Sequence, residues 1–316
     1  MRTRSQETDT GWVGAGPDDD LHRRLEAEEV PFDPTRPHVR SLLGPIDPGA
    51  LGPTLMGEPL DLAARSLERR GPAVGGREVL LAELEDAYAG GIRAIVALCR
   101  TDAALDDLIW LAGRVPLHLV AACPPGLVEQ DTDQRIGALV LDLDDTDSPA
   151  SLAIERVEAV HRARSLPVSV RVDHPAEAGE AVDALRLRGV AADRLWVGGC
   201  DWADGGNVPV SLLRAGISVA FDTLYRVRDT ARPGTQSGAQ VAKLAGLARA
   251  GNADRLLLGS GIDDSSGYRV GGGPGVAAVL ESVPIELMDD GVEALAIRAM
   301  MVEAPARLLT IRAGVA

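Results

Sequence analysis

The stretch PVSVRVDHPAEAGEAVDALRLRGVAADRLWVGG, residues 167–199, contains one complete strand–helix–strand unit. Pro167 to Val172 and Leu195 to Gly199 are short apolar runs of the kind that form strands buried on both faces. The segment between them, Ala176 to Arg188, has apolar residues at helical spacing. This order predicts two parallel strands joined by a helical crossover.

The same unit recurs along the chain. Eight predicted strands alternate with segments of helical period, which favours an α/β fold of the (β/α)8 TIM-barrel type. A doubly wound open sheet is the alternative, because periodicity does not show closure. The predicted strands are Leu51 to Met56, Ile92 to Leu98, Leu117 to Ala122, Ala138 to Leu143, Pro167 to Val172, Leu195 to Gly199, Ile217 to Phe221 and Arg255 to Gly259. The other predicted helices include Glu78 to Ala89, Ala103 to Arg114, Ser151 to Arg164 and Ala239 to Ala250.

The two ends of the chain differ from this pattern. Residues 1–37 are rich in charge, Gly and Pro, and only Asp20 to Glu29 has the charge pattern of a short helix. We expect a flexible N-terminal extension over residues 1–37 and one barrel domain over residues 38–316. After the last predicted strand, the Gly-rich segment Asp263 to Pro284 is predicted to be a long mobile loop. A C-terminal helix is predicted at Gly291 to Val302.

Composition narrows the classes of partner. The 316 residues carry a formal net charge of −15, which would repel phosphate backbones and anionic membrane surfaces. No apolar run approaches the roughly 20 residues that span a bilayer, and the start of the chain lacks the apolar core of a signal peptide. We therefore expect a soluble cytoplasmic protein without nucleic-acid or membrane partners. Cys99, Cys123 and Cys200 form no CxxC pair and are predicted to be reduced, partly buried thiols.

Several strings resemble the phosphotriesterase-related family of the amidohydrolase superfamily and occur in that family's order. The resemblance covers about residues 39 to 311. The most specific match is VRSLLGPIDPGALGPTLMGEPL at 39–60, which is similar to the segment that leads into the family's first strand. Further matches are IRAIVAL at 92–98, VHRARSLPVSVRVD at 160–173, VGGCD at 197–201, FDT at 221–223, DRLLLGSGID at 254–263 and APARLL at 304–309.

The resemblance implies two divalent metals such as zinc, held by histidines, a carboxylated lysine and an aspartate at strand ends. This chain departs from that pattern at each ligand position. The family's Met-His-Glu-His becomes Met56-Gly57-Glu58-Pro59, and the only lysine, Lys243, is in a predicted helix. Because zinc needs converging imidazole, thiolate or carboxylate ligands, no metal and no other cofactor is predicted. The residues at the expected ligand positions are Gly57, Pro59, Val140, Arg171, Gly199 and Gly261.

Polar residues remain at the predicted strand ends. Arg171 stands at a metal-ligand position, where its guanidinium would replace the positive charge of the metals and bind a carboxylate or phosphate. The plainer interpretation is a salt bridge between Arg171 and Glu58. Asp173 beside His174 could act as an acid–base pair, although adjacent residues on a strand point to opposite faces. A loop-capping Asp173 and a solvated His174 are the alternative. Asp222 either lines a polar pocket or caps a turn.

Three further residues are candidates for ligand binding together with Arg171. Cys200 would be a nucleophile if a nearby cation stabilised its thiolate, but a structural cysteine under the sixth loop is the plainer interpretation. Asp201 follows it in the string that resembles the family, and Tyr225 lies near Asp222 in the sequence. These positions predict a polar mouth that could receive a small molecule.

Two functions are consistent with these observations. The first is a phosphotriesterase-like protein with a degenerate metal site that no longer performs binuclear-metal hydrolysis and is retained for ligand binding or assembly, including homo-oligomer formation. The second is a repurposed metal-independent hydrolase, lyase or isomerase that acts on a small anionic, ester or lactone substrate. Its catalytic candidates are Glu58, Arg171, Asp173 and Asp222.

Overall fold

A computed structural model describes residues 36–60, 76–143, 150–226 and 238–312. The predicted N-terminal extension, except for its last two residues, lies outside these ranges, as does the helix predicted at Asp20 to Glu29. Within the described ranges, no helix combines the length and the apolar composition needed to cross a bilayer.

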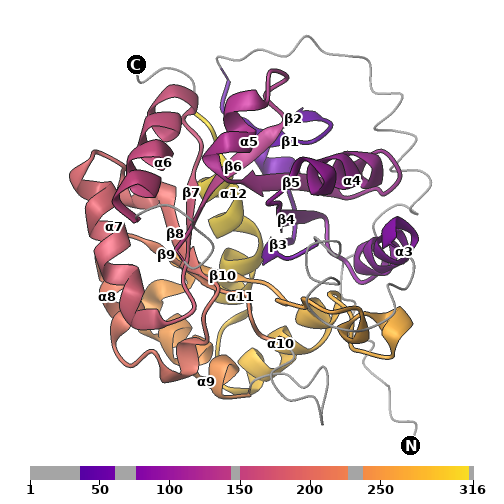
Figure 1. The fold of residues 1–316 in the computed structure, drawn as a ribbon. Coiled ribbons are helices and arrows are strands. Elements are labelled where there is room, and N and C mark those ends of the chain that lie inside the picture. Colours follow the sequence, from indigo (N-terminus) through magenta and orange to yellow (C-terminus); the bar gives the residue numbers. More distant parts are fainter. Residues whose placement is uncertain (1–35, 61–75, 144–149, 227–237, 313–316) are drawn as a thin grey trace, which may run out of the picture.

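Eight parallel strands form a nearly closed barrel surrounded by helices, as predicted (Figure 1). Neighbours in the sequence are neighbours in the sheet, from the first barrel strand to the last. Each strand overlaps its predicted run, because strands buried on both faces must be apolar at nearly every position. The barrel strands are β3 (Thr54–Glu58), β4 (Ala94–Leu98), β5 (His118–Cys123), β6 (Ile136–Asp142), β7 (Val168–Arg171), β8 (Leu195–Gly198), β9 (Ser218–Phe221) and β10 (Leu256–Leu258).

The helices cover the outer face of the barrel, with α6, α7 and α8 along one side and α3 and α4 along another (Figure 1). Sequence periodicity did not predict α5 and α8, whose six and seven residues are too few to show a helical period. The helices are α3 (Gly76–Ala89), α4 (Asp102–Ala112), α5 (Pro125–Gln130), α6 (Ala150–Arg164), α7 (Ala178–Leu187), α8 (Val208–Arg214), α9 (Gly238–Leu247), α10 (Ala278–Asp289), α11 (Ala294–Arg298) and α12 (Ala304–Leu309).

The segment after β10 differs from the prediction of a long mobile loop. Its second part begins α10, which contains Pro284. The buried side chains of Val279, Val283 and Leu287 follow one another at four-residue intervals, and their packing outweighs the roughly 3 kcal/mol cost of an internal proline. The predicted C-terminal helix is present but begins later: Gly291 has a φ of +79° after the end of α10, and α11 begins three residues later.

The Gly-rich part of that segment is held by a buried carboxylate. Glu83 of α3 accepts hydrogen bonds from the backbone N–H groups of Arg269 at 3.0 Å and Val276 at 2.6 Å. Burial raises the pKa of Glu83 above its usual value. The Gly-rich stretch between Arg269 and Val276, which was predicted to be mobile, is therefore bound to α3 at both of its ends.

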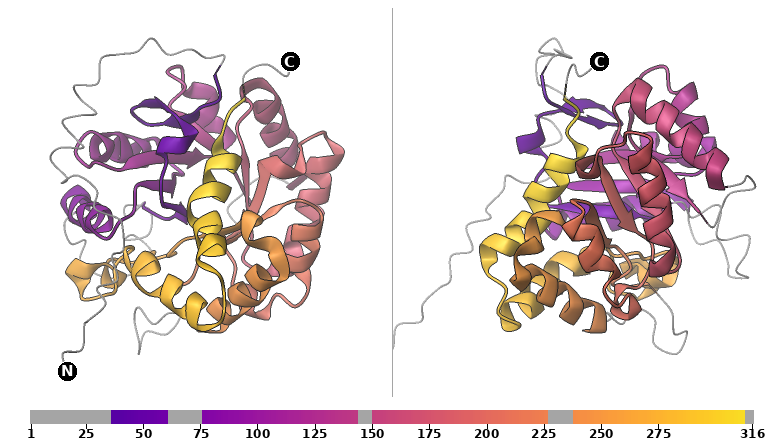
Figure 2. Two further views of the ribbon diagram at one scale, coloured as in Figure 1. Left: turned by 180° about the vertical axis from the view of Figure 1, so that it is seen from behind. Right: turned by 90° about the vertical axis from the view of Figure 1, so that its left-hand side faces the viewer.

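Two apolar clusters make up the core. One lies between the strands and the helices, and the other fills the barrel and includes Val96, Trp196 and Leu257. A hairpin of β1 (Val39–Ser41) and β2 (Gly44–Ile46) and helix α12 contribute to the second cluster. In the view from behind, α12 lies in front of the barrel strands (Figure 2). The opposite end, where the strands finish, holds the polar residues.

The first and last barrel strands, β3 and β10, meet at a seam that one side chain bridges through hydrogen bonds. Glu58 at the end of β3 accepts hydrogen bonds from both the backbone N–H and the hydroxyl of Ser260, which follows β10. Gly259 allows this approach, since a Cβ there would lie 2.2 Å from the carbonyl oxygen of Met56. Glu58 therefore closes the barrel at the carboxyl ends of β3 and β10.

Candidate functional site

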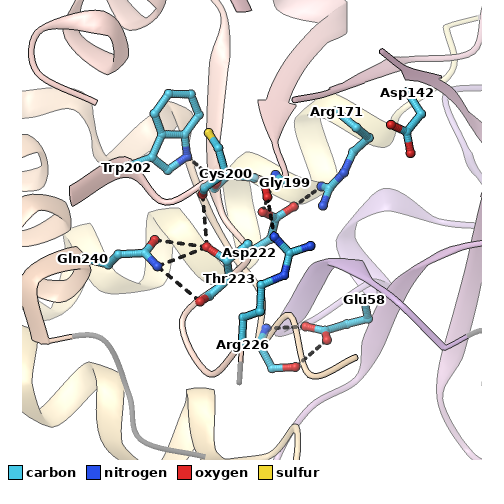
Figure 3. A network of polar contacts seen from close by, with 12 residues as sticks. Glu58, Asp142, Arg171, Gly199, Cys200, Trp202, Asp222, Thr223, Arg226 and Gln240 are labelled. Carbon is cyan, nitrogen blue, oxygen red and sulfur yellow. Dashed lines mark hydrogen bonds and ion pairs between the residues drawn. The ribbon is translucent and has the colours of Figure 1, made fainter. Parts of the chain in front are cut away.

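Arg171 and Asp222 form a buried ion pair at the strand-end face of the barrel (Figure 3). Arg171 ends β7 and Asp222 follows β9, so the pair bridges over β8. Nη1 of Arg171 donates to Oδ2 of Asp222, and Oδ1 accepts the backbone N–H of Gly199 at 2.9 Å. The side chain of Arg171 is 8% exposed and that of Asp222 is 0% exposed. Asp222 is thus a buried counter-ion and not the turn cap that was one of its two sequence interpretations.

Three glycines make room for this pair. A Cβ at Gly57 would lie 2.4 Å from Oδ2 of Asp222, and one at Gly198 would lie 2.5 Å from the same atom. A Cβ at Gly199 would lie 3.2 Å from Nε of Arg171. We call these three residues the glycine collar. Gly57 follows Met56 of β3, which lies across the barrel from β7, so the ion pair occupies the middle of the mouth.

The predicted salt bridge between Arg171 and Glu58 is wrong. Arg171 pairs with Asp222, whereas the two oxygens of Glu58 are bound by Ser260 at the seam. The reason is geometric: Asp222 emerges two strands from Arg171, and Glu58 faces β10 across the seam. Glu58 is fully buried, and this burial raises its pKa to about 7, although the hydrogen bonds from Ser260 oppose the shift.

Arg226 adds a second guanidinium at the mouth, and sequence reasoning missed it. Its Nη1 donates to the carbonyl oxygen of Gly199 at 2.9 Å, and its Nε lies 3.7 Å from a carboxylate oxygen of Asp263. Figure 3 shows Arg226 beside the Arg171–Asp222 pair. Because Arg226 lies five residues beyond the end of β9, it was not among the residues expected at the strand ends.

Asp173, His174 and Asp201 lie on the segments that follow β7 and β8. Asp173 and His174 are both exposed, and His174 precedes a short 3₁₀ turn at Pro175–Glu177. Asp201 accepts the backbone N–H of Ala203 at 2.9 Å and so caps a 3₁₀ turn. Asp173 and His174 thus lie at the rim of the mouth.

Cys200 and Tyr225 are packed beneath the mouth. Burial and the nearby Asp222 carboxylate raise the pKa of the Cys200 thiol to about 12, which opposes formation of a nucleophilic thiolate. The hydroxyl of Tyr225 donates to the carbonyl oxygen of Ala278 at 3.2 Å and bonds the hydroxyl of Ser282 at 2.5 Å. Tyr225 therefore anchors α10 to the end of β9.

The residues at the mouth do not fit a binuclear metal centre. In the described parts of the chain, no three His, Cys, Asp or Glu side chains lie close enough together to hold an ion. A buried guanidinium at Arg171 would repel a divalent cation at the same place. Lys243 donates to the carbonyl oxygen of Gly206 at 2.6 Å, away from the strand ends. The positions that the resemblance assigns to ligands hold Gly57, Pro59, Val140, Arg171, Gly199 and Gly261.

A cleft of about 470 Å³ lies between the ends of β4, β5 and β6 and helices α5 and α6, and its lining residue Asp142 pairs with Arg171 in the ladder between β6 and β7. Its volume is in the range of small-molecule sites. Val140, at the position where the resemblance expects a lysine, lines it, as do the apolar side chains of Leu127 and Leu152. Arg100 and Asp142 supply a polar wall through an ion pair of 2.6 Å.

Solved structures with this fold agree with the resemblance seen in the sequence. No protein-family model matches the chain. No curated protein matches it either. A resiniferatoxin-binding protein from Rhodobacter sphaeroides matches with a TM-score of 0.72 and 20% identity over 86% of this chain and 94% of that one. The phosphotriesterase from Mycobacterium tuberculosis matches with a TM-score of 0.70 and 20% identity over 86% and 98%.

The lactonase from Listeria monocytogenes matches with a TM-score of 0.73 and 16% identity, over 86% of this chain and 98% of that one. At these identities the likeness concerns the fold. The predicted barrel and the predicted likeness to phosphotriesterases are therefore confirmed at the level of the fold.

Proposed function

We propose that this chain is a phosphotriesterase-like barrel that does not perform binuclear-metal hydrolysis and binds a small molecule at its strand-end mouth. The observation that carries the proposal is the buried Arg171–Asp222 ion pair inside the glycine collar. A guanidinium and its counter-ion fill the space where the resemblance would place two metals. The cleft between the ends of β4, β5 and β6 and helices α5 and α6 leaves room for a ligand.

Two further observations support binding in place of hydrolysis. Both oxygens of Asp222 already accept hydrogen bonds, one of them from a buried guanidinium whose positive charge would oppose a metal cation at the same carboxylate. A solved protein of the same fold is named for resiniferatoxin binding and not for a reaction. The ligand class expected from the cleft is a small amphipathic molecule, because apolar walls face the Arg100–Asp142 pair.

The proposal is tested by metal content and turnover together. Untagged protein is purified without chelator, its bound zinc, manganese and cobalt are measured, and hydrolysis of an alkyl γ-lactone and of an aryl phosphotriester is followed with and without added metal. We expect less than one metal per chain and no metal-stimulated hydrolysis. Two tightly bound metals per chain, or turnover restored by zinc, would contradict the proposal.

Binding in the cleft is tested with the same lactone as the probe, observed by ligand-detected NMR. Leu152→Trp narrows the cleft from α6, where Leu152 is 54% exposed, and should weaken lactone binding at least tenfold. Leu187→Trp is the matched control, since Leu187 is 87% exposed on α7 and is not part of the cleft. Equal weakening in both variants, or no binding to the native chain, would argue against this site.

The second candidate is a metal-independent enzyme, and the observation in its favour is the carboxyl of Glu58. A pKa of about 7 suits a general acid or base at neutral pH, but Glu58 is fully buried at the seam and substrate would reach it only if the mouth opened. If this candidate is right, Glu58→Gln and Arg171→Ala each abolish turnover of the substrate while the circular dichroism of the barrel is retained.

A further inference from the structure

Cys99 and Cys123 lie side by side at the ends of two neighbouring strands. The ladder between β4 and β5 pairs Leu98 with Ala122, and the next residue on each strand is a cysteine. The backbone N–H of Cys99 donates to the carbonyl oxygen of Ala122 at 2.9 Å, so the strands remain in register at this point. Neighbouring strands lie about 4.8 Å apart, which is within the range of Cα separations that a disulfide spans.

Both thiols face the same way. Side chains alternate along a strand, and Cys99 and Cys123 both belong to the apolar cluster between the barrel and its helices. Cys99 is 1% exposed and Cys123 is 0% exposed. A hydrogen bond between the two thiols, together with burial, raises the pKa of Cys123 far above its usual value. The pair is therefore protonated in the folded chain, and because the thiolate is the species that reacts, we expect its oxidation to be slower than that of an exposed thiol.

We propose that Cys99 and Cys123 form a reversible redox pair, which a peroxide or a small disulfide converts into an intramolecular disulfide across the ends of β4 and β5. Joining them leaves no unpaired polar group in the apolar layer, because a disulfide is itself apolar. The third cysteine, Cys200, follows β8 and has no cysteine on a neighbouring strand.

The reaction with hydrogen peroxide balances in two steps. The sulfur of one cysteine attacks a peroxide oxygen, the O–O bond breaks, and the thiol proton leaves with the departing hydroxide as water, which gives a sulfenic acid. The second thiol attacks that sulfur, the S–S bond forms, the S–O bond breaks, and a second water leaves. Two sulfur atoms are oxidised and two peroxide oxygens are reduced. A dithiol reverses the change by thiol–disulfide exchange.

The position of the pair couples it to the cleft. Arg100 follows Cys99 directly and Pro124 follows Cys123 directly, and both line the cleft. A covalent link between the two cysteines would fix the spacing of these two walls. Formation of the disulfide does not depend on the proposed function, and only its effect on a bound ligand does.

The experiment treats the folded full-length chain with hydrogen peroxide, or with diamide, and counts the thiols that remain after denaturation in the presence of an alkylating reagent. Of the three thiols in the chain, we expect two to be lost and restored by dithiothreitol, with a linked peptide pair containing Cys99 and Cys123 in mass spectrometry. Cys200→Ala should give the same linked pair, and Cys99→Ala and Cys123→Ala should each give none.

Three results would overturn the proposal. They are three intact thiols after oxidation, a linked pair that includes Cys200, and a linked pair that forms only at urea concentrations that unfold the barrel. Because Cys99→Ala removes a small buried side chain, circular dichroism on each variant verifies that the barrel is folded before thiols are counted.

Discussion

At the scale of single residues, the Arg171–Asp222 pair determines what the mouth can hold. Two charges taken out of water are tolerated only when each has a partner and the remaining polar atoms are hydrogen-bonded. Asp222 meets this condition through Arg171 and the backbone of Gly199. The pair was not predictable from the sequence, since its members are 51 residues apart and their meeting depends on the order of strands in the closed barrel.

Arg171→Met should lower the free energy of unfolding by about 3–5 kcal/mol, because the variant leaves the carboxylate of Asp222 buried without its counter-ion. Urea unfolding followed by circular dichroism measures the loss. Adding Asp222→Asn to this variant should recover part of it, because the amide oxygen still accepts the N–H of Gly199. Arg156→Met is the control: Arg156 pairs with Glu129 at the surface, where an ion pair contributes about 1 kcal/mol or less.

Glu58 should make stability depend on pH. Its pKa is about 7 in the folded chain and 4.5 when exposed, so between these values the folded chain binds more protons than the unfolded chain. The free energy of unfolding therefore falls as pH rises from 4.5 to 7, by up to about 3 kcal/mol, and levels off above pH 7. The groups that face this carboxyl are Ser260, Asp222 and the backbone of Gly261.

Glu58→Gln should remove this fall, since the amide keeps a hydrogen-bond acceptor for the N–H of Ser260 and does not ionise. Urea unfolding of both chains at pH 5 and pH 8 makes the comparison. The variant should gain stability relative to the native chain at pH 8 and little at pH 5. A pH profile unchanged by the substitution would mean that Glu58 does not titrate in this range.

At the scale of elements, the connection after β10 shows how one side chain can order a segment that the sequence marks as loose. The glycines of residues 271–273 predicted mobility, yet this stretch is fastened by Glu83 from α3, more than 180 residues earlier in the chain. The composition of the segment itself gives no sign of a contact with a residue so distant in the sequence. The strands, by contrast, were predictable because a strand buried on both faces consists of consecutive apolar residues.

Glu83→Ala should free this segment. The change removes two hydrogen bonds from backbone N–H groups to a buried carboxylate, at a cost of about 3 kcal/mol. Hydrogen exchange read by mass spectrometry should speed up over residues 267–276 and remain unchanged in β7 and β8. Glu85→Ala on the exposed side of the same helix is the control and should leave the exchange of this segment as it is in the native chain.

At the scale of the whole molecule, the fold and the character of the mouth differ in how far the sequence predicts them. Eight apolar runs and the helices between them predicted the barrel, and solved structures confirm the fold. The residues at the positions that the resemblance assigns to ligands predicted a mouth without the family's metal ligands, but not the ion pair between Arg171 and Asp222. Taken singly, Gly57 and Gly199 stand where the resemblance expects histidines. Taken together with Arg171, they leave the space that the Arg171–Asp222 ion pair occupies.

The glycine collar and the ion pair also limit which single substitutions could introduce a histidine at the mouth. A histidine placed at position 57 while the ion pair stands would push its Cβ into the carboxylate of Asp222, in a backbone conformation with a φ of +74° that side chains rarely adopt. Removing Arg171 first would leave the buried carboxylate of Asp222 without its counter-ion. A histidine at position 57 is thus opposed by the residues in place, and we expect it to be tolerated only if Arg171 and Asp222 are replaced at the same time.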